Sequence, residues 1–555
     1  MKKTLLFVLL LLCTRFIFAQ SDIWLWAKQA GGTYSDEGNG IAIDSSGNSY
    51  VTGRFQGTAT FGTTTLTTTG SSEIADIFVA KLDSSGNWLW ATKAGGNDRD
   101  YGYDIATDFS GNSYVTGYFN GTASFGGTTL TSSGYIDIFI AKLDSSGNWL
   151  WVKKAGGTNY DGGYGIAIDS SGNSYVTGYF QGSASFGTIT LTSNSNSRDI
   201  FVAKLDSSGN WLWAKQAGGT SPDYSYGIAI DSSGNSYVTG YFEGTASFGT
   251  TTLTCTEDID IFIAKLDSNG NWLWAKQAGG SYWDMGYSIA IDSSGNSYVT
   301  GNFGETASFG TTTLTSIGSA DIFVAKLDSN GNWLWAKQAG GTSSVAYGYS
   351  IATDSSGNSY VTGYFDSTAS FGSITLTSSG DSDIFVTKLD SNGNWLGAIK
   401  AGGTQRDIGY GIAIDSSGNS YVTGCFQWIS SFGNITLTSS GSFDIFVAKA
   451  YIPYDSNDIV VVEGTTGLGA IYPNPFNPVA NIPYNLSEIS NADFYIYNVK
   501  GQLVRHINVG PQHPGYYQIS WNGKDDNGKS CSSGIYYFIM KAGEQTFQRK
   551  AVLLK

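Results

Sequence analysis

The side chains of this sequence best suited to chemistry are acids that recur at one position of a repeated pattern. Each acid stands five residues before the first isoleucine of a strand-like segment, and a tyrosine usually lies between the two. The acids are Asp36, Asp100, Asp161, Asp223, Asp284 and Asp407. The tyrosines are Tyr103, Tyr164, Tyr226, Tyr287, Tyr349 and Tyr410, and Asn39 takes this place in the first copy. Carboxylates and phenols gathered around one axis could hold a cation or a sugar.

These recurring residues also have a structural interpretation. A feature that is copied into nearly every unit of a repeat protein is usually part of its scaffold. On this interpretation each aspartate caps its own loop, and each tyrosine packs on the next unit. The repetition favours the structural interpretation, and the six acids remain candidate ligand contacts.

Residues that break the repeat are more informative about a ligand. They are Arg54, Arg99, Arg198, Pro222, Trp283, Arg406, Cys425 and Trp428. Arg99 and Trp283 fall in loops between units, where repeat proteins commonly present binding surfaces, so we predict that both contact an unidentified glycan or protein ligand. The Asp/Asn-rich turns could hold calcium, but their glycine stands at position four and the EF-hand requires it at position six. We therefore predict no metal site and no cofactor.

No histidine occurs between residues 23 and 450. This absence excludes Ser-His-Asp catalysis, Cys-His catalysis and histidine metal sites from that region. Two acids at the mouth of a channel could still act as a glycosidase pair, so a carbohydrate-active enzyme is one alternative to a binding protein. A purely structural envelope protein is another. We predict no catalytic residue, because an active site normally breaks the repeat.

One phrase, Asp-Ser-Ser-Gly-Asn-Ser-Tyr-Val-Thr-Gly, organises most of the chain. It begins at Asp44, Asp108, Asp169, Asp231, Asp292, Asp354 and Asp415, with Phe109 as its one early deviation. The copies start 61 to 64 residues apart, which is typical of a repeated supersecondary unit. In the first copy we expect strands at Ile41–Ile43, Ser49–Phe55, Asp76–Leu82 and Trp88–Trp90, with a longer connection at Gly57–Ile74.

The third of these strands is apolar on both faces. Ile77 and Val79 point to one side, and Phe78 and Ala80 point to the other. A sheet of this kind must be covered on both sides, which predicts four-stranded blades arranged in a ring. Most tryptophans lie in the fourth strand, where we expect them to pack between neighbouring blades.

The two ends of the repeated region predict how the ring closes. The region opens with a fourth-strand segment at Trp24, and its last copy stops after the third-strand segment Asp444–Lys449. Pairing these two segments completes seven blades and removes an open sheet edge. We therefore predict an all-β chain, with a seven-bladed β-propeller at residues 23–450 closed by N-terminal strand pairing with the last blade.

The repeated pattern resembles a known family. Gly-Ile-Ala-Ile-Asp-Ser-Ser-Gly-Asn-Ser-Tyr-Val-Thr-Gly, followed by Asp-Ile-Phe-Val-Ala-Lys-Leu-Asp, is similar to the SBBP-type bacterial β-propeller repeat over about residues 23–450. The resemblance implies the propeller fold and no defined activity.

The composition changes near residue 450, since every proline except Pro222 lies beyond it. We expect a linker at residues 451–467. Strand-like segments then recur, at Phe494–Tyr497 for example, and predict a small Ig-like β-sandwich at residues 468–555.

This C-terminal segment resembles the sorting domain of type IX secretion substrates, which is similar to the Ig-like domain of the flagellar hook-capping protein. The first matching motif is Tyr472, Pro473, Asn474, Pro475, Phe476, Asn477 and Pro478. Further matches lie at Gly501–Val504, Trp521–Gly528, Ser533–Tyr536 and Arg549–Lys555. The resemblance implies recognition by outer-membrane secretion and sorting machinery, and then release or attachment at the cell surface.

The N-terminus and the overall charge agree with an exported protein. Two lysines and the apolar run Leu5–Leu12 predict a signal peptide at residues 1–20. No later run is long enough for a membrane-spanning helix. The net charge of −15 disfavours nucleic acid and anionic lipid as partners. The remaining cysteines, Cys255, Cys425 and Cys531, stand at unrelated points and predict no disulfide framework.

Overall fold

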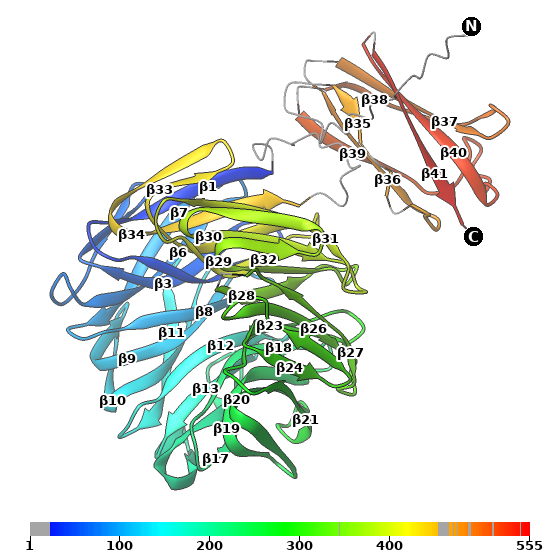
Figure 1. Ribbon diagram of the computed structural model, residues 1–555. Coiled ribbons are helices and arrows are strands. Elements are labelled where there is room, and N and C mark those ends of the chain that lie inside the picture. The colour runs from blue at the N-terminus through cyan, green and yellow to red at the C-terminus, as the bar shows by residue number, and fades with distance from the viewer. Residues whose placement is uncertain are drawn as a thin grey trace, which may run out of the picture.

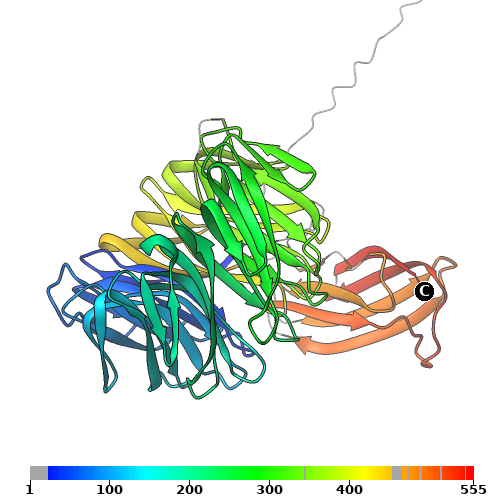
Figure 2. The same ribbon diagram turned by 90° about the horizontal axis from the view of Figure 1, so that it is seen from below.

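The computed structural model describes residues 23–342, 345–452, 466–469, 471–472, 474–486, 490–512, 515–543 and 545–554. The predicted signal peptide and most of the predicted linker lie outside these residues. The described residues form strands, one short 3-10 turn, η2 (Asn194–Asn196), and no α-helix. The strands build seven four-stranded blades and a smaller β-sandwich (Figure 1, Figure 2).

Each blade contains four antiparallel strands, counted outward from the axis of the ring. The innermost strands are β2 (Glu37–Ile43), β8 (Tyr101–Thr107), β12 (Gly162–Ile168), β18 (Asp223–Ile230), β22 (Met285–Ile291), β28 (Ala346–Thr353) and β32 (Ile408–Ile414). The second strands are β3 (Ser49–Gln56), β9 (Ser113–Phe125), β13 (Ser174–Gln181), β19 (Ser236–Phe248), β23 (Ser297–Phe303), β29 (Ser359–Phe371) and β33 (Asn419–Phe432). The third strands are β6 (Ala75–Leu82), β10 (Thr128–Leu143), β16 (Arg198–Leu205), β20 (Thr251–Leu266), β26 (Asp321–Leu327), β30 (Ile374–Leu389) and β34 (Ile435–Tyr451). The outermost strands are β7 (Trp88–Gly96), β11 (Trp149–Gly157), β17 (Trp211–Gly219), β21 (Trp272–Gly280), β27 (Trp333–Ala339), β31 (Trp395–Gly403) and β1 (Trp24–Gly32).

The part of each third strand that corresponds to Asp76–Leu82 is almost entirely buried, as its two apolar faces predict. Every residue of β6, for example, is buried. Between neighbouring blades, apolar side chains from both sheets form a continuous core, as in the cluster that joins Ile77 and Val79 to Val115 and Phe119. The fourth-strand tryptophans take part in this packing: the Trp90 indole Nε1 donates to the Ser145 carbonyl of the following blade at 3.1 Å.

A tyrosine in the second strand also joins each blade to its neighbour. The Tyr50 hydroxyl is fully buried, and lies 3.0 Å from the Gly111 carbonyl of the next blade and 3.3 Å from Asp44 Oδ2. The Lys81 ammonium lies over the Tyr50 ring at 4.5 Å and 3.7 Å from Asp44 Oδ2. An equivalent aspartate, tyrosine and lysine recur around the ring. The repeated turn therefore also joins neighbouring blades.

The connection between the second and third strands is more ordered than the sequence predicts. In the first blade it forms a hairpin of β4 (Thr58–Phe61) and β5 (Thr64–Thr67), and similar hairpins are β14 (Ser183–Phe186) with β15 (Ile189–Thr192) and β24 (Thr306–Phe309) with β25 (Thr312–Thr315). Elsewhere the long second and third strands continue into this extension. Each extension pairs with the outermost strand of the preceding blade, as β4 does with β1 through Ala59 and Gly32. A Cβ on Gly32 would lie 1.8 Å from the Thr58 carbonyl oxygen, so this close approach requires glycine.

The ring closes as the ends of the repeat predict. β1 pairs antiparallel with β34, with Ala27 opposite Ala448 and Ala30 opposite Ile445 (Figure 1). Trp24 is buried in this blade, and its indole Nε1 donates to the Lys400 carbonyl at 3.1 Å. β34 runs two residues further than the predicted segment, because Ala450 and Tyr451 continue the ladder with β33.

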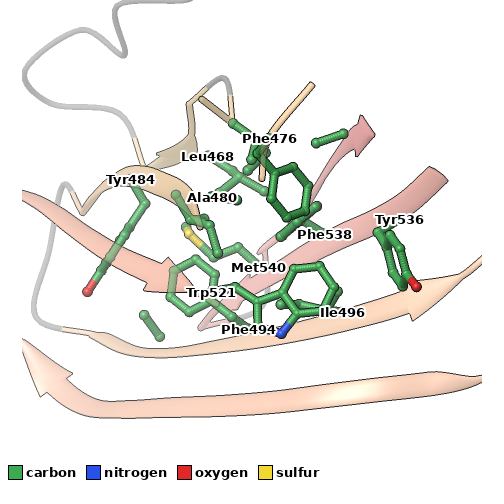
Figure 3. Packing of buried hydrophobic residues seen from close by; sticks show 14 of the residues in the cluster. Leu468, Phe476, Ala480, Tyr484, Phe494, Ile496, Trp521, Tyr536, Phe538 and Met540 are labelled. Atoms are coloured by element: carbon green, nitrogen blue, oxygen red, sulfur yellow. The ribbon is translucent and has the colours of Figure 1, made fainter. Parts of the chain in front are cut away.

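The C-terminal residues form a separate sandwich. One sheet contains β35 (Gly467–Leu468), β36 (Ala480–Leu486) and β39 (Gly515–Trp521). The other contains β38 (Leu503–Gln512), β37 (Ser490–Asn498), β40 (Gly534–Ala542) and β41 (Gln545–Leu553). Trp521 is buried between the sheets against Phe476 and Phe538 (Figure 3). The linker prediction ends slightly late, because Gly467 already pairs in β35.

The pairing of β1 with β34 predicts the effect of an N-terminal truncation. A chain without residues 1–32 exposes the edge of β34 and loses the burial of Trp24. We expect its melting temperature to fall by roughly 10 °C, because removing a buried tryptophan alone costs about 3–5 kcal/mol. We also expect self-association through the exposed edge. Calorimetry and light scattering measure both effects.

A chain without residues 1–22 is the matched control, since it keeps β1 intact. Equal melting temperatures and a monomeric state for both truncations would contradict the proposed role of β1 in closure.

Candidate functional site

The innermost strands share an irregularity that aims one side chain per blade toward the axis. In β8 the pairing with β9 passes from Gly102 directly to Asp104, so Tyr103 is an extra, unpaired residue. The same shift occurs in all seven innermost strands. Such β-bulges commonly redirect a side chain at a binding site. The bulged residues are Asn39, Tyr103, Tyr164, Tyr226, Tyr287, Tyr349 and Tyr410.

The six bulged tyrosines follow one another around the ring. The centroids of Tyr103 and Tyr164 lie 4.6 Å apart, and the next four neighbouring pairs lie 5.1 to 5.6 Å apart. Asn39 interrupts the series, and its Nδ2 donates to the Gly102 carbonyl at 2.8 Å. Burial holds the pKa of Tyr103 well above its usual value, as it does for Tyr226. The phenols are therefore neutral at physiological pH.

These tyrosines line a cavity of about 470 Å³ at one mouth of the central channel. This volume lies within the usual range for small-molecule sites. The first blade adds charge to the lining: the Arg54 guanidinium forms an ion pair with Glu37, donates to the Tyr101 hydroxyl at 2.9 Å and stacks over the Tyr101 ring at 4.7 Å. The cavity is thus largely aromatic, with its seven-fold symmetry broken at the first blade.

Asp104 is the second charged group that the sequence interpretation did not single out. Its oxygens accept hydrogen bonds from the backbone amides of Ile105 and Ile166, at 2.8 and 2.9 Å. Burial raises the pKa of Asp104 to about 6 against the lowering effect of these amides. One signal was present in the sequence, because the other six repeats have glycine or serine at this position.

The six predicted acids do not line this cavity. Each is fully buried beneath the loop that joins two blades. Asp223 is representative: Oδ2 accepts the Gly219 amide at 2.7 Å, and Oδ1 accepts the Glu243 amide at 3.2 Å. Equivalent amide contacts hold Asp36, Asp100, Asp161, Asp284 and Asp407. The contacts are those expected of loop caps.

Burial also alters the titration of these acids. It raises the pKa of Asp36, Asp100, Asp223 and Asp284 to about 8, and that of Asp161 and Asp407 to about 7. A second buried carboxyl lies near most of them at the start of a third strand, and Asp199 raises the pKa of Asp223 further in this way. The protein therefore holds a set of carboxyl groups that stay protonated near neutral pH.

The other two predicted contacts lie on exposed loops. Arg99 is exposed immediately before Asp100, and Trp283 is 56% exposed immediately before Asp284. A bridge to Ile259 positions the Trp283 backbone beside the third strand of the preceding blade. Both are free to meet a ligand at the same mouth of the ring as the tyrosine cavity, since the bulged tyrosines follow these loops within a few residues.

The opposite mouth of the channel is built from the repeated turns. It forms a cavity of about 1010 Å³ lined by the Asp-Ser-Ser-Gly segments. Burial alone would raise the pKa of Asp44, but hydrogen bonds from Asn48 and Ser46 and the charge of Lys81 lower it. These donors occupy the aspartate oxygens that a calcium ion would need. Among the described residues no three acids, histidines or cysteines converge as a metal site would require.

The predicted sorting motif joins the start of the sandwich to the last strand of the chain. The Asn474 side-chain oxygen accepts the Val552 amide at 2.9 Å, and the buried Phe476 exchanges backbone hydrogen bonds with Val552 and Leu554. Tyr472 pairs with Asn481 at the start of β36. Pro473 of the motif, and His513 elsewhere in the sandwich, lie outside the described residues.

Comparison with known proteins supports both the propeller and the C-terminal domain. Seven segments match the beta-propeller repeat family SBBP, at residues 25–54, 89–125, 150–179, 212–241, 273–302, 334–367 and 398–424. Residues 479–546 match the FlgD Ig-like domain. The predicted repeat and Ig-like domain are thus confirmed.

Two curated proteins are similar to this chain. An uncharacterized WD repeat-containing protein of Acanthamoeba polyphaga mimivirus is 27% identical over 533 residues, which cover 77% of this chain and 38% of that protein. The regulatory protein FlaEY of Caulobacter vibrioides is 30% identical over 110 residues, which cover 19% of this chain and 12% of that protein. The chain therefore spans well under half the length of these relatives.

Solved structures give weaker likenesses. PorZ, a surface component of the type-IX secretion system of Porphyromonas gingivalis, is 11% identical, with 93% of this chain and 74% of that chain covered and a TM-score of 0.25. A puromycin hydrolase is 8% identical, with 82% and 59% covered and a TM-score of 0.36. Neither likeness carries an argument about function. In the part of the chain that the structure describes, no helix is long and apolar enough to cross a bilayer.

The buried acids predict an unusual dependence of stability on pH. Between pH 4 and pH 8 the unfolded chain loses protons that Asp36, Asp100, Asp223 and Asp284 retain in the folded state, so folding becomes less favourable as the pH rises. We expect the melting temperature to be higher at pH 5.5 than at pH 8 by roughly 5 °C or more. Calorimetry across this range measures the effect.

Two features make the result interpretable. The propeller contains no histidine, so no imidazole of the propeller can change its melting temperature in this range. The turn aspartates, such as Asp44, have lowered pKa values and reverse the trend only below about pH 4. A melting temperature that stays constant or rises from pH 5.5 to pH 8 would contradict the assignment of buried protonated carboxyls.

Proposed function

We propose that this chain, which carries seven SBBP beta-propeller repeats and a FlgD Ig-like domain, is an exported protein that binds a glycan or protein ligand at the tyrosine-lined mouth of its propeller. The proposal places the protein outside the cell or on its surface. It gives the propeller the binding role and the C-terminal domain the role of delivery.

One observation carries the binding role: two positions beside this cavity differ from blade to blade, although the turns and the buried third-strand segments are nearly constant. Two residues before each bulged residue the seven blades have Glu37, Tyr101, Gly162, Tyr224, Met285, Tyr347 and Ile408. On the adjacent second strand they have Arg54, Tyr118, Tyr179, Tyr241, Asn302, Tyr364 and Cys425. The turns and the buried third-strand segments repeat closely, whereas these two positions differ from blade to blade.

The burial of the six acids supports a binding role over an enzymatic one. A glycosidase needs two carboxyl groups that reach the scissile bond from opposite sides. Asp223 and Asp284 instead accept backbone amides beneath the loops, and Asp104 accepts two amides at the cavity. We therefore propose a non-catalytic protein.

The C-terminal domain supports a route across the outer membrane. Its Tyr472–Pro478 motif resembles the start of the sorting domains of type IX substrates, and this segment is bound to the end of the chain through Asn474 and Phe476. We propose that outer-membrane secretion machinery recognises the folded sandwich, and that the chain is then released or attached at the cell surface.

The delivery role predicts the fate of a truncated chain. Removing residues 468–555 leaves the propeller with its signal segment and should stop the protein in the periplasm. Cell fractionation and protease accessibility of intact cells measure the location. The double variant R198Q/R406Q, which keeps the sandwich, is the control and should be exported normally. Surface delivery of the truncated chain would refute the delivery role.

The binding role predicts which substitutions remove a ligand signal. On a glycan array, the full-length chain should give signals that W283A and R99A reduce severalfold, because both side chains are exposed beside the cavity mouth. L212A is the control, since Leu212 is exposed on the outermost strand β17, away from the axis. Array signals unaffected by W283A and R99A, or no signal at all, would contradict a glycan ligand at this mouth.

A further inference from the structure

The arginines of the propeller have an uneven distribution. Between residues 23 and 450 the sequence contains four arginines, Arg54, Arg99, Arg198 and Arg406, and all four depart from the repeat. Three of them lie against tyrosines around the cavity, and Arg99 lies in a loop at the same mouth. The lysines instead follow the repeat, as Lys81 and Lys142 do in their ion pairs with the turn aspartates at the opposite mouth. Guanidinium groups are thus concentrated at one place in a chain of net charge −15.

Arg198 and Arg406 lack the usual partner of a guanidinium. Arg54 is neutralised by Glu37, but no carboxylate forms an ion pair with Arg198 or Arg406 among the described residues. Arg198 donates to the Tyr224 hydroxyl and lies 5.4 Å from the centroid of the Tyr179 ring. Arg406 lies 5.4 Å from the centroid of Tyr364. Both positive charges are therefore held in place by aromatic rings and remain available to an anion.

The two arginines stand on opposite sides of the tyrosine cavity. Arg198 begins the third strand of the third blade, and its charge acts on Tyr164 of the cavity lining. Arg406 precedes the innermost strand of the seventh blade, and its charge acts on Tyr349 and Tyr410 of the lining. Neither guanidinium belongs to the cavity lining itself, but each acts on tyrosines that do, so the two charges flank its rim.

The lining of the cavity favours sugar rings over an extended polar ligand. Several of its polar groups are already engaged: Tyr287 contacts Met285 Sδ at 3.1 Å, the Glu37 oxygens face Arg54, and Asp104 accepts two backbone amides. What remains is a circle of aromatic surface, on which the apolar faces of sugar rings stack well. A peptide would need an open strand edge or an apolar groove, and the innermost strands have their edges turned toward one another.

We propose that the ligand of this cavity is a carboxylate-bearing glycan, with sugar rings stacked on the bulged tyrosines and carboxylates bound by Arg198 and Arg406. The inference rests on the proposed function and specifies its ligand class. The planar guanidinium matches a carboxylate through two parallel N–H donors, which a lysine cannot reproduce. The carboxylate of each sugar therefore supplies most of the selectivity against neutral glycans. The tyrosines supply most of the surface that is buried on binding.

The test uses the purified full-length chain and isothermal calorimetry. The probes are a tetramer of galacturonic acid and the same tetramer with its carboxyls methyl-esterified, which keeps the sugar rings and removes the charge. We expect the acid to bind at least tenfold more tightly than the ester, and the affinity to fall as salt increases. R198Q and R406Q should each weaken the acid roughly tenfold and leave the ester unchanged.

Matched variants separate charge from folding. R198K keeps the charge and should recover only part of the affinity, because lysine lacks the paired donors. K215Q removes a cation from the outermost strand β17 of the same blade and should have no effect. The melting temperature of each variant checks its fold.

Three outcomes of the calorimetry would overturn the inference. They are equal affinity for the acid and its ester, tighter binding of a polyglutamate peptide than of the acidic tetramer, and no measurable binding of either tetramer. A neutral glycan found on the array and lost in W283A would overturn this inference while leaving the proposed function intact. The calorimetry and the glycan array together therefore distinguish failure of this inference from failure of the proposed function.

Discussion

Every blade of this propeller is apolar on both faces, so no blade can bury its core without a neighbour on each side. This constraint explains why the chain repeats seven times and why its first strand crosses to its last blade. The third strand illustrates it, since β6 is buried along its whole length although it contains both a lysine and an aspartate. Ring closure through β1 and β34 therefore stabilises the whole domain, because an open edge would leave apolar surface in water.

Much of this architecture could be predicted because it is encoded locally and then copied. The alternation of Ile77 and Val79 with Phe78 and Ala80 is enough to predict a sheet covered twice, and the unmatched segments at the two ends predict the closure. The extension hairpins were missed because their strands are only four residues long and gain stability from a partner in the preceding blade. Pairing of this kind depends on the position of one glycine, Gly32, and short-range patterns do not reveal it.

The candidate site was only partly predictable, for a related reason. The sequence places an acid and a tyrosine in the same short loop, and nothing local indicates which of them faces the channel. The structure decides this through a bulge: the extra residue Tyr103 turns toward the axis, while Asp100 remains beneath the loop and accepts the amides of Gly96 and Asn120. Asp104 was missed because one of its contacts, with the Ile166 amide, comes from the next blade, and Glu37 because its partner Arg54 lies on the neighbouring strand of its own blade.

The bulge also explains how a repeated scaffold can vary at one place without loss of stability. A bulged residue lies outside the strand ladder and points away from the core between blades, so its replacement disturbs neither. The first blade has Asn39 instead of tyrosine at this position, and the Asn39 side-chain amide donates a hydrogen bond to the Gly102 carbonyl. The neighbouring positions occupied by Arg54 and Cys425 have varied in the same way. Seven such positions surround one axis, so a few substitutions can change the charge and shape of a single cavity while every turn and every buried strand stays the same. This mouth is therefore the part of the ring where the sequence can vary at least cost to folding, and it is also where we propose that the ligand binds.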